Sequence, residues 1–570
     1  MPEADPAPAA TPLLDRAWPW QLAGALICLS FGFTEMMGSD LWWHLAAGRE
    51  IIQTGTLWLV DDWSFTELGS PWHNHEWLAD LLFYGWASLL GVPSLVYWKW
   101  LLIIASFGLL QHVITRVSGS APAALLASAA AVAIAAPFLD MRPQLYTLLG
   151  VAVLLNLALR RRPRLIELLA LFLVWANLHG GFVFGLMLLA ILLFPWRELT
   201  LSALRDAALR GLACVLVCLL NPDGVNIFTL PLEYALNADS PYRSLAEWRS
   251  PFEGGGIRSS LYLYTLVLGA ALAASWVLPS LRRRVPLLPE ALAFALLTAA
   301  MSATSRRFII LWAMGFALLL APFAAALLRQ RLLRPLLWPV LLAAFAWGGV
   351  RLAPYPLRAD VAYHYLTAEY VYPHAIADFV EINGLQGNTF AYYNWGGFLH
   401  WRSDGALKVF LDGRANTLFD DPTYLDYLTV LGAQPGWIER IEQSGAELFL
   451  WPRSGRGERL HQGLLQTRRW RLLYEDARGR LLAHESFALP RTLRHPRGSL
   501  ASDLSNVVAA LRRNDTQAAL SAASRAHDRR PWDHGACTWL KRSLQVAGRE
   551  AEADAVIAGC RDWFPSRYLR

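Results

Sequence analysis

The chain has 570 residues, of which 55% are hydrophobic and 17% are charged. So high an apolar fraction excludes an ordinary soluble protein and indicates a polytopic helical membrane protein. The formal net charge of +6 comes from arginine clusters that separate apolar runs, so it reports membrane orientation and excludes nucleic acid as the expected partner.

The first 16 residues lack a basic segment and a cleavage site, so we expect a disordered tail rather than a signal peptide. Apolar runs of transmembrane length follow. They fall at about 17–37, 93–115, 121–138, 143–160, 165–179, 182–196, 207–221, 259–280, 287–303, 308–328 and 334–352. We therefore expect about eleven transmembrane helices in a domain that covers residues 17–353.

Basic clusters lie between these runs, and all of them fall on the cytoplasmic side when the N-terminus is placed there. They are Arg116, then Arg160, Arg161, Arg162 and Arg164, then Arg197, Arg205 and Arg210, then Arg282, Arg283 and Arg284, and finally Arg329, Arg331 and Arg334. The remaining loops then face outward and hold most of the unusual polar residues. We expect these loops to build one site between helices; the alternative is that each loop only solvates its own turn.

The first outer loop, residues 38–92, begins GSDLWWHL. Asp40 is the candidate catalytic base or acceptor-orienting group, and its alternative role is a helix N-cap. His44 lies one helical turn later and is a candidate for binding a phosphate or orienting Asp40; otherwise it is a rim residue. We expect Trp42 and Trp43 to lie at the membrane interface.

Further along this loop, His75 and Glu76 are candidate substrate-binding residues. Glu76 also precedes an amphipathic segment, where a carboxylate favours the helix N-terminus in any case. Asp61, Asp62 and His73 have the ligand types of a divalent cation, although the same residue types also cap turns. No metal site is therefore predicted, and a divalent cation stays an open possibility.

The later outer loops add further candidate substrate-binding residues, which are Arg142, Gln144, His179, Glu247, Arg306 and Arg307. Arginines on the outer side run against the orientation trend, and a guanidinium just above the bilayer is suited to bidentate phosphate contact. We expect Arg142 and one of Arg306 and Arg307 to bind phosphate. The alternative is that they pair with carboxylates such as Glu247 or Asp140.

The C-terminal part divides in two. Residues 354–495 alternate strand-like and helical patterns and indicate an exported α/β domain, in which Trp395-Gly396-Gly397 and Asp412-Gly413-Arg414 are first of all turns. Residues 496–570 indicate helical hairpins whose spacing weakly resembles tetratricopeptide repeats, and a protein partner is expected for them. The five cysteines predict neither a zinc site nor a disulfide framework, although Cys537 and Cys560 are able to pair if exported.

The stretch SDLWWHLAAGREIIQTGTLWLVDDWSF, followed by SPWHNHEWLADLLFYGWASLLG, resembles the first outer loop of the C superfamily of glycosyltransferases (GT-C), as found in lipid A aminoarabinose transferases and protein O-mannosyltransferases. The resemblance covers about residues 17–116 in detail and the rest by topology. A wider set, with RPQ, NLHGG, EWRSP and WGG, is similar to bacterial GT-C-like membrane proteins with tetratricopeptide-like tails. The chain departs from the pattern at Ser39-Asp40, where relatives carry two acids, and at His73-Asn74-His75-Glu76, where they carry Lys-Pro-Pro.

This resemblance implies a GT-C fold in a bacterial inner membrane, with a cytoplasmic N-terminus and a periplasmic C-terminal domain. It implies transfer of a sugar from a polyprenyl-phosphate donor to an exported glycan, lipid or protein, with Asp40 in the place of the essential acid. The alternative is a catalytically degenerate scaffold in an envelope polysaccharide assembly. A transporter ranks behind both, because the sequence has no inverted repeat and no charge in mid-span.

Overall fold

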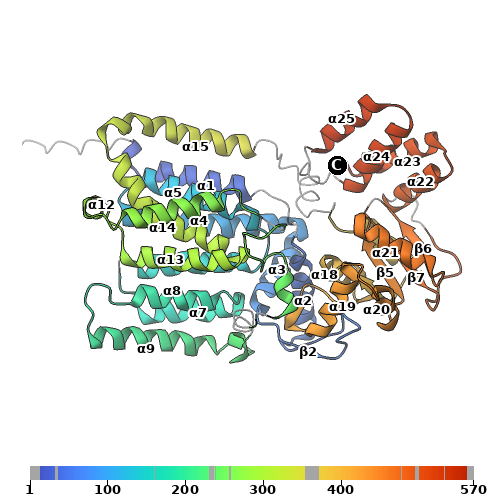
Figure 1. Ribbon diagram of the computed structural model, residues 1–570, viewed down its shortest axis with the longest axis horizontal. Helices are drawn as coiled ribbons and strands as arrows, with labels where there is room; N and C mark the ends of the chain where they lie inside the picture. The colour runs from blue at the N-terminus through green and yellow to red at the C-terminus, as the bar shows by residue number, and fades with distance from the viewer. Residues whose placement is uncertain are drawn as a thin grey trace, which may run out of the picture. The chain divides into compact units, whose positions relative to one another are not determined.

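The computed structural model describes residues 13–561 except 33–35, 37, 160, 230–236, 238, 256–257, 353–370, 477, 495–497, 499 and 532. Most of the predicted N-terminal tail, and the predicted boundaries near 353 and 495, lie outside the described residues. The chain forms two compact units (Figure 1). The helical unit contains described residues within 13–32, 97–229 and 243–352, and the mixed unit contains those within 36–96, 237–242 and 371–561.

Each of the eleven predicted apolar runs contains a helix. These helices are α1 (Trp18–Gly32), α4 (Leu95–Ser118), α5 (Ala121–Ala135), α6 (Gln144–Ala158), α7 (Leu165–Leu178), α8 (Phe182–Leu193), α9 (Leu201–Cys218), α11 (Tyr262–Ser275), α13 (Pro289–Thr304), α14 (Ile309–Leu328) and α15 (Leu337–Leu352). Short elements flank them, namely η1 (Leu13–Asp15), η3 (Ala136–Phe138), η4 (Pro241–Ser244), α12 (Pro279–Arg284), η5 (Arg306–Phe308) and η6 (Arg331–Leu336).

Four helical segments among the described residues are long and apolar enough to cross a membrane. They are Val92–Ser118, Ala121–Phe138, Arg306–Leu328 and Leu332–Arg351. The protein is therefore a helical membrane protein. Five of the other predicted spans, α6, α7, α8, α11 and α13, are apolar helices of only 10–17 residues, whereas a hydrocarbon core of about 30 Å needs about 20 helical residues. Length and composition thus account for four of the eleven predicted spans.

The core of the helical unit forms around α14, which packs against α5 and α13, while α1 packs against α5 and α15 (Figure 1). A second contact joins α6, α7 and α8 around the ring of Trp175, which is buried. A Cβ at Gly150 would come within 2.6 Å of that ring, and a Cβ at Gly185 within 2.5 Å. Both glycines are needed for these helices to approach the tryptophan, and this packing fixes the end of α7.

The mixed unit contains a five-stranded sheet with strand order β4-β3-β5-β7-β6. The strands are β3 (Gly387–Ala391), β4 (Leu407–Val409), β5 (Leu448–Pro452), β6 (Trp470–Glu475) and β7 (Gly479–His484). Strand β3 runs parallel to β4 and β5, and β7 runs antiparallel to β5 and β6. The helices of this region are α17 (His374–Ile382), α18 (Gly396–Ser403), α19 (Asp421–Leu431), α20 (Trp437–Gln443) and α21 (Gly455–Gln466).

The first loop belongs to the mixed unit. It forms α2 (Asp40–Thr54), a hairpin of β1 (Leu59–Val60) and β2 (Pro71–Trp72), α3 (Trp77–Leu90) and η2 (Val92–Ser94). Next to the hairpin, Ser64 forms a parallel bridge with Val409. The Phe65 amide donates to the Val409 carbonyl at 3.1 Å, and the Val409 amide donates to the Trp63 carbonyl at 3.0 Å. The first loop therefore extends the sheet beyond β4.

Trp42 and Trp43 lie inside the protein, with only 4% and 8% of their surface exposed. The Trp42 ring packs edge-on against Phe398 of α18, with the ring centres 5.1 Å apart. The expectation that this pair lies at the membrane interface is therefore wrong. Trp42 is buried against Tyr372 and Phe398, and Trp43 is buried against Trp72 of the first loop.

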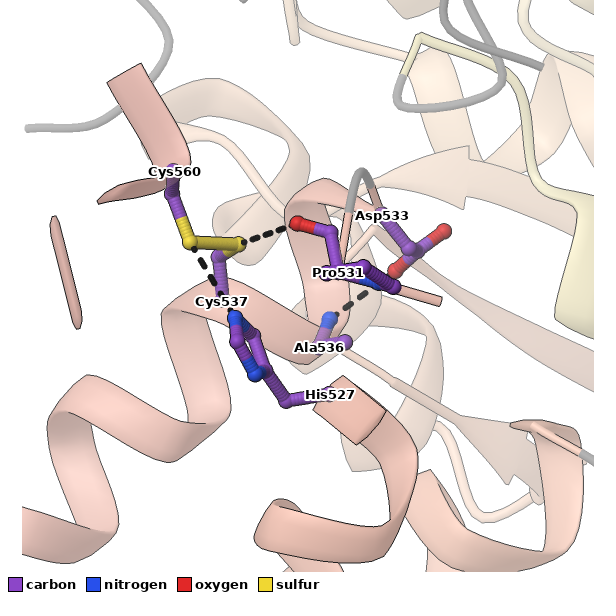
Figure 2. Close-up of a disulfide and its surroundings, with 6 residues drawn as sticks. All are labelled: His527, Pro531, Asp533, Ala536, Cys537 and Cys560. Carbon is purple, nitrogen blue, oxygen red and sulfur yellow. Dashed lines mark hydrogen bonds between the residues drawn. A yellow bond between two sulfur atoms is a disulfide. The ribbon is translucent and has the colours of Figure 1, made fainter. Parts of the chain in front are cut away.

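The C-terminal tail consists of α22 (Leu500–Arg512), α23 (Thr516–Arg529), α24 (His534–Val546) and α25 (Glu550–Arg561). A disulfide joins Cys537 of α24 to Cys560 of α25, so the pairing that the sequence left open is present (Figure 2). Figure 2 also shows His527 of α23 beside it, with Nε2 3.6 Å from Cys560 Sγ. These three residues have metal-ligand types, but their two sulfur atoms are already joined to each other.

Candidate functional site

The candidate residues fall into two groups, one in each unit. The helical unit contains Arg142, Gln144, His179, Glu247, Arg306 and Arg307, and the mixed unit contains Asp40, His44, Asp61, Asp62, His73, His75 and Glu76. Each group is built from segments far apart in the sequence.

Within the helical unit, Arg142, His179, Glu247 and Arg307 form what we call the Glu247 cluster. Arg142 Nη1 donates to Glu247 Oε2 at 2.7 Å, and Arg307 Nη1 donates to Glu247 Oε1 at 3.0 Å. The three side chains stay partly exposed, at 24% for Arg142, 29% for Arg307 and 21% for Glu247. Pairing of the arginines with Glu247, which the sequence left open, is thus present, and the cluster keeps an excess of positive charge.

The two arginines beside Glu247 keep its carboxyl group ionised. Burial alone raises the pKa of this carboxyl group, but Arg142 and Arg307 more than offset that effect and lower the pKa to about 2. Glu247 is consequently ionised throughout the physiological range. The Arg307 guanidinium also lies over the Trp248 ring, 4.8 Å from its centre, which holds the arginine in place.

The loop that carries Glu247 is fixed by its backbone. The Arg307 amide and the Ser305 hydroxyl both donate to the Glu247 carbonyl at 3.0 Å. Arg306 is buried, and its Nη2 donates to the Glu253 carbonyl at 2.7 Å. Arg306 therefore holds this loop, whereas its neighbour Arg307 points into the Glu247 cluster.

Gln144 and His179 are both buried at helix ends. Gln144 starts α6, and its Nε2 donates to the Phe138 carbonyl at 2.9 Å, so it closes the turn before the helix. His179 follows the last residue of α7. Its Nδ1 lies 2.7 Å from Thr147 Oγ1 and accepts from the Gly181 amide at 2.9 Å, and its Nε2 lies 3.5 Å from Arg307 Nη2.

In the mixed unit, His44 lies between two carboxylates from the α3 end of the loop. Its Nδ1 lies 2.5 Å from Asp80 Oδ1, and its Nε2 lies 3.9 Å from Glu76 Oε2. Asn74 Nδ2 donates to the second Asp80 oxygen at 2.7 Å. His75 Nε2 is 3.6 Å from Glu76 Oε1. His44, Glu76 and His75 are therefore brought together.

Asp80 was not a candidate in the sequence, although an acid one helical turn after Glu76 in an apolar segment is a detectable signal. Its side chain is fully buried, and burial raises the pKa of its carboxyl group, an effect that His44 partly opposes. Because a buried carboxylate needs a partner, Asp80 fixes the ring of His44 between α2 and α3.

Asp40 is the first residue of α2, so Ser39, rather than Asp40, occupies the N-cap position. Asp40 is partly buried, and Oδ1 accepts a hydrogen bond from the Ser39 hydroxyl at 3.1 Å. A Cβ at Gly413 would lie 3.2 Å from that same oxygen, and a Cβ at Gly397 would lie 3.0 Å from the Trp43 backbone. The glycines of the WGG and DGR motifs thus let the start of α2 approach the α/β region.

A second arginine–carboxylate cluster, which we call the Arg414 cluster, consists of Asp61, Asp412 and Arg414. Arg414 Nη2 lies 2.7 Å from Asp61 Oδ1 and 2.9 Å from Asp412 Oδ2, and all three side chains are 0% exposed. Its guanidinium also lies over the Trp63 ring, 4.2 Å from the centre. Asp61 is therefore a partner of Arg414 and joins the first loop to the α/β region.

The other two cation-ligand candidates lie near this cluster in sequence. The Asp62 carbonyl accepts a hydrogen bond from Lys408, and His73 is exposed. Asp61 Oδ2 accepts from the Ser64 hydroxyl at 2.6 Å. Since both oxygens of Asp61 already bind protein groups, this carboxylate fits a role in the fold better than a cation.

A scan against models of known protein families finds no match to this chain, and a search of curated proteins finds no significant match. The two groups of residues and their geometry are therefore what supports a function.

Proposed function

We propose that this protein is a membrane glycosyltransferase of the GT-C type. It moves a sugar from a polyprenyl-phosphate-linked donor to an exported glycan, lipid or protein. The observation that carries this proposal is the Glu247 cluster, in which two partly exposed arginines share one carboxylate beside the ends of apolar helices.

The chemistry of such a donor matches this cluster. A polyprenyl phosphate has an apolar chain that stays in the bilayer and an anionic head at its surface. Arg142 lies just before α6, His179 just after α7 and Arg307 just before α14, which are all apolar helices. Guanidinium groups at that level bind phosphate oxygens in pairs and stabilise the negative charge that grows on the leaving phosphate.

Asp40 is the proposed base. It accepts the proton of the acceptor hydroxyl while that oxygen attacks the anomeric carbon of the sugar and the bond to the phosphate breaks. Asp40 is the first residue of α2, so its carboxylate lies at the positive end of the helix dipole. Glu76 is proposed to contact the substrates, and His44, which is buried with Nε2 3.9 Å from Glu76 Oε2, is proposed to orient it.

The proposed fold has more membrane-spanning helices than helix length and composition alone support. In this proposal all eleven apolar helices lie in the membrane, including those of 12–16 residues such as α7 and α13. The protein sits in a bacterial inner membrane with its α/β region and tail in the periplasm. The Cys537–Cys560 disulfide supports this side, since disulfides persist in oxidising compartments.

The test uses the full chain in nanodiscs with undecaprenyl phosphate, and native mass spectrometry counts the bound lipid. Arg142→Ala and Arg307→Ala are expected to weaken binding about tenfold each, the scale of one charge-assisted hydrogen bond. Arg440→Ala removes an exposed arginine of the mixed unit and is the matched control. Undecaprenol, which lacks the phosphate, separates head binding from chain binding. Equal binding by all variants would contradict the proposal.

Transfer is then measured with a sugar-loaded donor and Asp40→Asn. This change preserves size and removes the base, so we expect transfer to fall while lipid binding stays. Transfer at the original rate by a folded Asp40→Asn protein would remove the proposed role of Asp40.

The second candidate is a degenerate scaffold in an envelope polysaccharide assembly. The observation that favours it is the tail, whose four helices α22–α25 pack in succession as paired helices do in interaction modules. Under this alternative the full chain binds no polyprenyl phosphate, and deletion of the tail releases the assembly partners.

A further inference from the structure

We propose that Thr147 and Trp175 are positioning residues that set the proton of His179 on Nε2, which makes this ring the third hydrogen-bond donor of the phosphate site. This inference rests on the proposed function, because it assigns the phosphate of the donor to the Glu247 cluster. Thr147 contacts the ring of His179 and Trp175 contacts Thr147, so both act through His179.

Two groups beside this ring have fixed hydrogen-bonding roles. An indole nitrogen is only a donor, and so is a backbone amide. Trp175 Nε1 donates to Thr147 Oγ1 at 3.1 Å, and the Gly181 amide donates to His179 Nδ1 at 2.9 Å. Nδ1 therefore uses its lone pair and carries no proton.

The Thr147 hydroxyl completes this chain. Its oxygen accepts from Trp175 and lies 2.7 Å from His179 Nδ1. Since Nδ1 has no proton to give, the Thr147 hydroxyl is the donor in this contact and shares the Nδ1 lone pair with the Gly181 amide. Neutral imidazole has one proton, which then resides on Nε2.

The position of Nε2 beside Arg307 lets this proton take part in binding an anion. Nε2 lies 3.5 Å from Arg307 Nη2, and two donors at that separation do not bond to each other. The same guanidinium donates through its Nη1 to Glu247 Oε1 at 3.0 Å, so the His179 ring and Glu247 are neighbours of one arginine. A phosphate that approaches the arginines meets three donors, from Arg142, Arg307 and His179.

The packing around the chain of bonds is tight. All three side chains are buried, with Thr147 4%, Trp175 2% and His179 7% exposed. A Cβ at Gly181 would collide with Thr147 Oγ1. The ring of His179 consequently has little freedom to turn over and exchange its two nitrogens.

The test compares two substitutions that separate hydrogen bonding from packing. Thr147→Val keeps the shape and loses the hydroxyl, whereas Thr147→Ser keeps the hydroxyl and loses a methyl group. We expect Thr147→Val to bind undecaprenyl phosphate about fivefold more weakly in nanodiscs and Thr147→Ser to bind it as the original protein does. Thr298→Val is the control, because among the described residues its hydroxyl bonds to carbonyls of its own helix α13. The reverse order, with Ser weaker than Val, would show a packing role and overturn the proposal.

A second measurement does not depend on phosphate. Solid-state ¹⁵N spectra of histidine-labelled protein, minus those of His179→Gln, show which ring nitrogen carries the proton. We expect Nε2 in the original protein and in Thr147→Ser, and a shift of population toward Nδ1 in Thr147→Val. A proton on Nδ1 in the original protein would overturn the inference. Nε2 protonation without any lipid binding would instead contradict the proposed function and, with it, the phosphate role assigned to His179.

Discussion

The Glu247 cluster and the Arg414 cluster use the same residue types in opposite proportions. In the first, two arginines share one carboxylate and all three side chains are 21–29% exposed. In the second, one arginine is shared by two carboxylates and all three are 0% exposed. An excess of accessible positive charge is suited to a ligand, whereas a sealed and balanced set is suited to joining segments.

The difference between the clusters also predicts which arginine can be replaced without a large loss of stability. Arg414 neutralises two buried carboxylates, and burial, which lowers its own pKa, is outweighed by Asp412 and Asp61, so the pKa is raised. Arg142 and Arg307 each leave Glu247 with a remaining partner. The clusters should therefore respond to mutation in different observables, one in stability and the other in binding.

The largest effect is expected for Arg414→Gln, which leaves Asp61 and Asp412 buried without a cation. We expect the mixed unit to lose about 3–5 kcal/mol of stability, the scale of a broken buried ion pair. Limited proteolysis during heating measures it, with Arg440→Gln as the exposed control. A melting profile equal to that of the control would show that the Arg414 cluster does not hold the first loop.

Arg306→Ala is expected to come next. This neighbour of Arg307 is buried and bonds to the Glu253 carbonyl, so its loss frees the loop that carries Glu247 and costs about 2–3 kcal/mol. Thermal unfolding in detergent tests it. Arg307→Ala in parallel should leave the melting temperature nearly unchanged, and equal destabilisation by both would remove the distinction between the two arginines.

Glu247→Gln probes the pH dependence of the Glu247 cluster. The folded pKa of about 2 lies below the ordinary 4.5, so this carboxylate stabilises the fold above pH 4.5 and loses that contribution as pH falls toward 2. We expect the original protein to lose roughly 2 kcal/mol more than the variant over that window, after allowance for partial exposure. Denaturant titrations at pH 5 and pH 3 measure the difference. Parallel loss in both proteins would assign the acid sensitivity elsewhere.

The smallest expected effect is a gain in affinity for undecaprenyl phosphate. Glu247→Gln removes the carboxylate that competes with phosphate, so undecaprenyl phosphate should bind about threefold more tightly at pH 7, where the carboxylate is ionised. Native mass spectrometry of the variant and of the original protein measures this difference in lipid binding. Weaker binding would mean that Glu247 orders the two arginines more than it competes with the ligand.

Runs of apolar residues were enough to place the helices, of which four in the described residues are long and apolar enough to cross a membrane. They were not enough to place Trp42 and Trp43, since a tryptophan has the same character at a membrane surface and in a core. The addition of residues near Ser64 to β4 was also missed. That contact uses backbone groups, which every residue has, so no side-chain pattern predicts it.

The candidate sites show the same limit. Single residues such as Arg142, His179 and Glu247 stood out because charges and histidines are rare beside apolar helices. Asp80, Thr147 and Trp175 did not, because their roles come from a neighbour more than 25 residues away, as the separation of 36 between His44 and Asp80 illustrates. Of these three residues, Asp80 alone carries a detectable signal, an acid in an apolar segment, and Thr147 and Trp175 carry none.

The pairing of the first loop with β4 imposes an order on synthesis. Trp72 bonds to Thr417, which is 345 residues later in the chain. At about 5–20 residues per second, the ribosome needs roughly 17–70 s to make the second half of this contact. During that interval Trp42 of α2 lacks Phe398 of α18, against which its ring packs. A nascent chain of this protein is then expected to depend on a chaperone or on the translocation machinery to shield its first loop until the rest emerges.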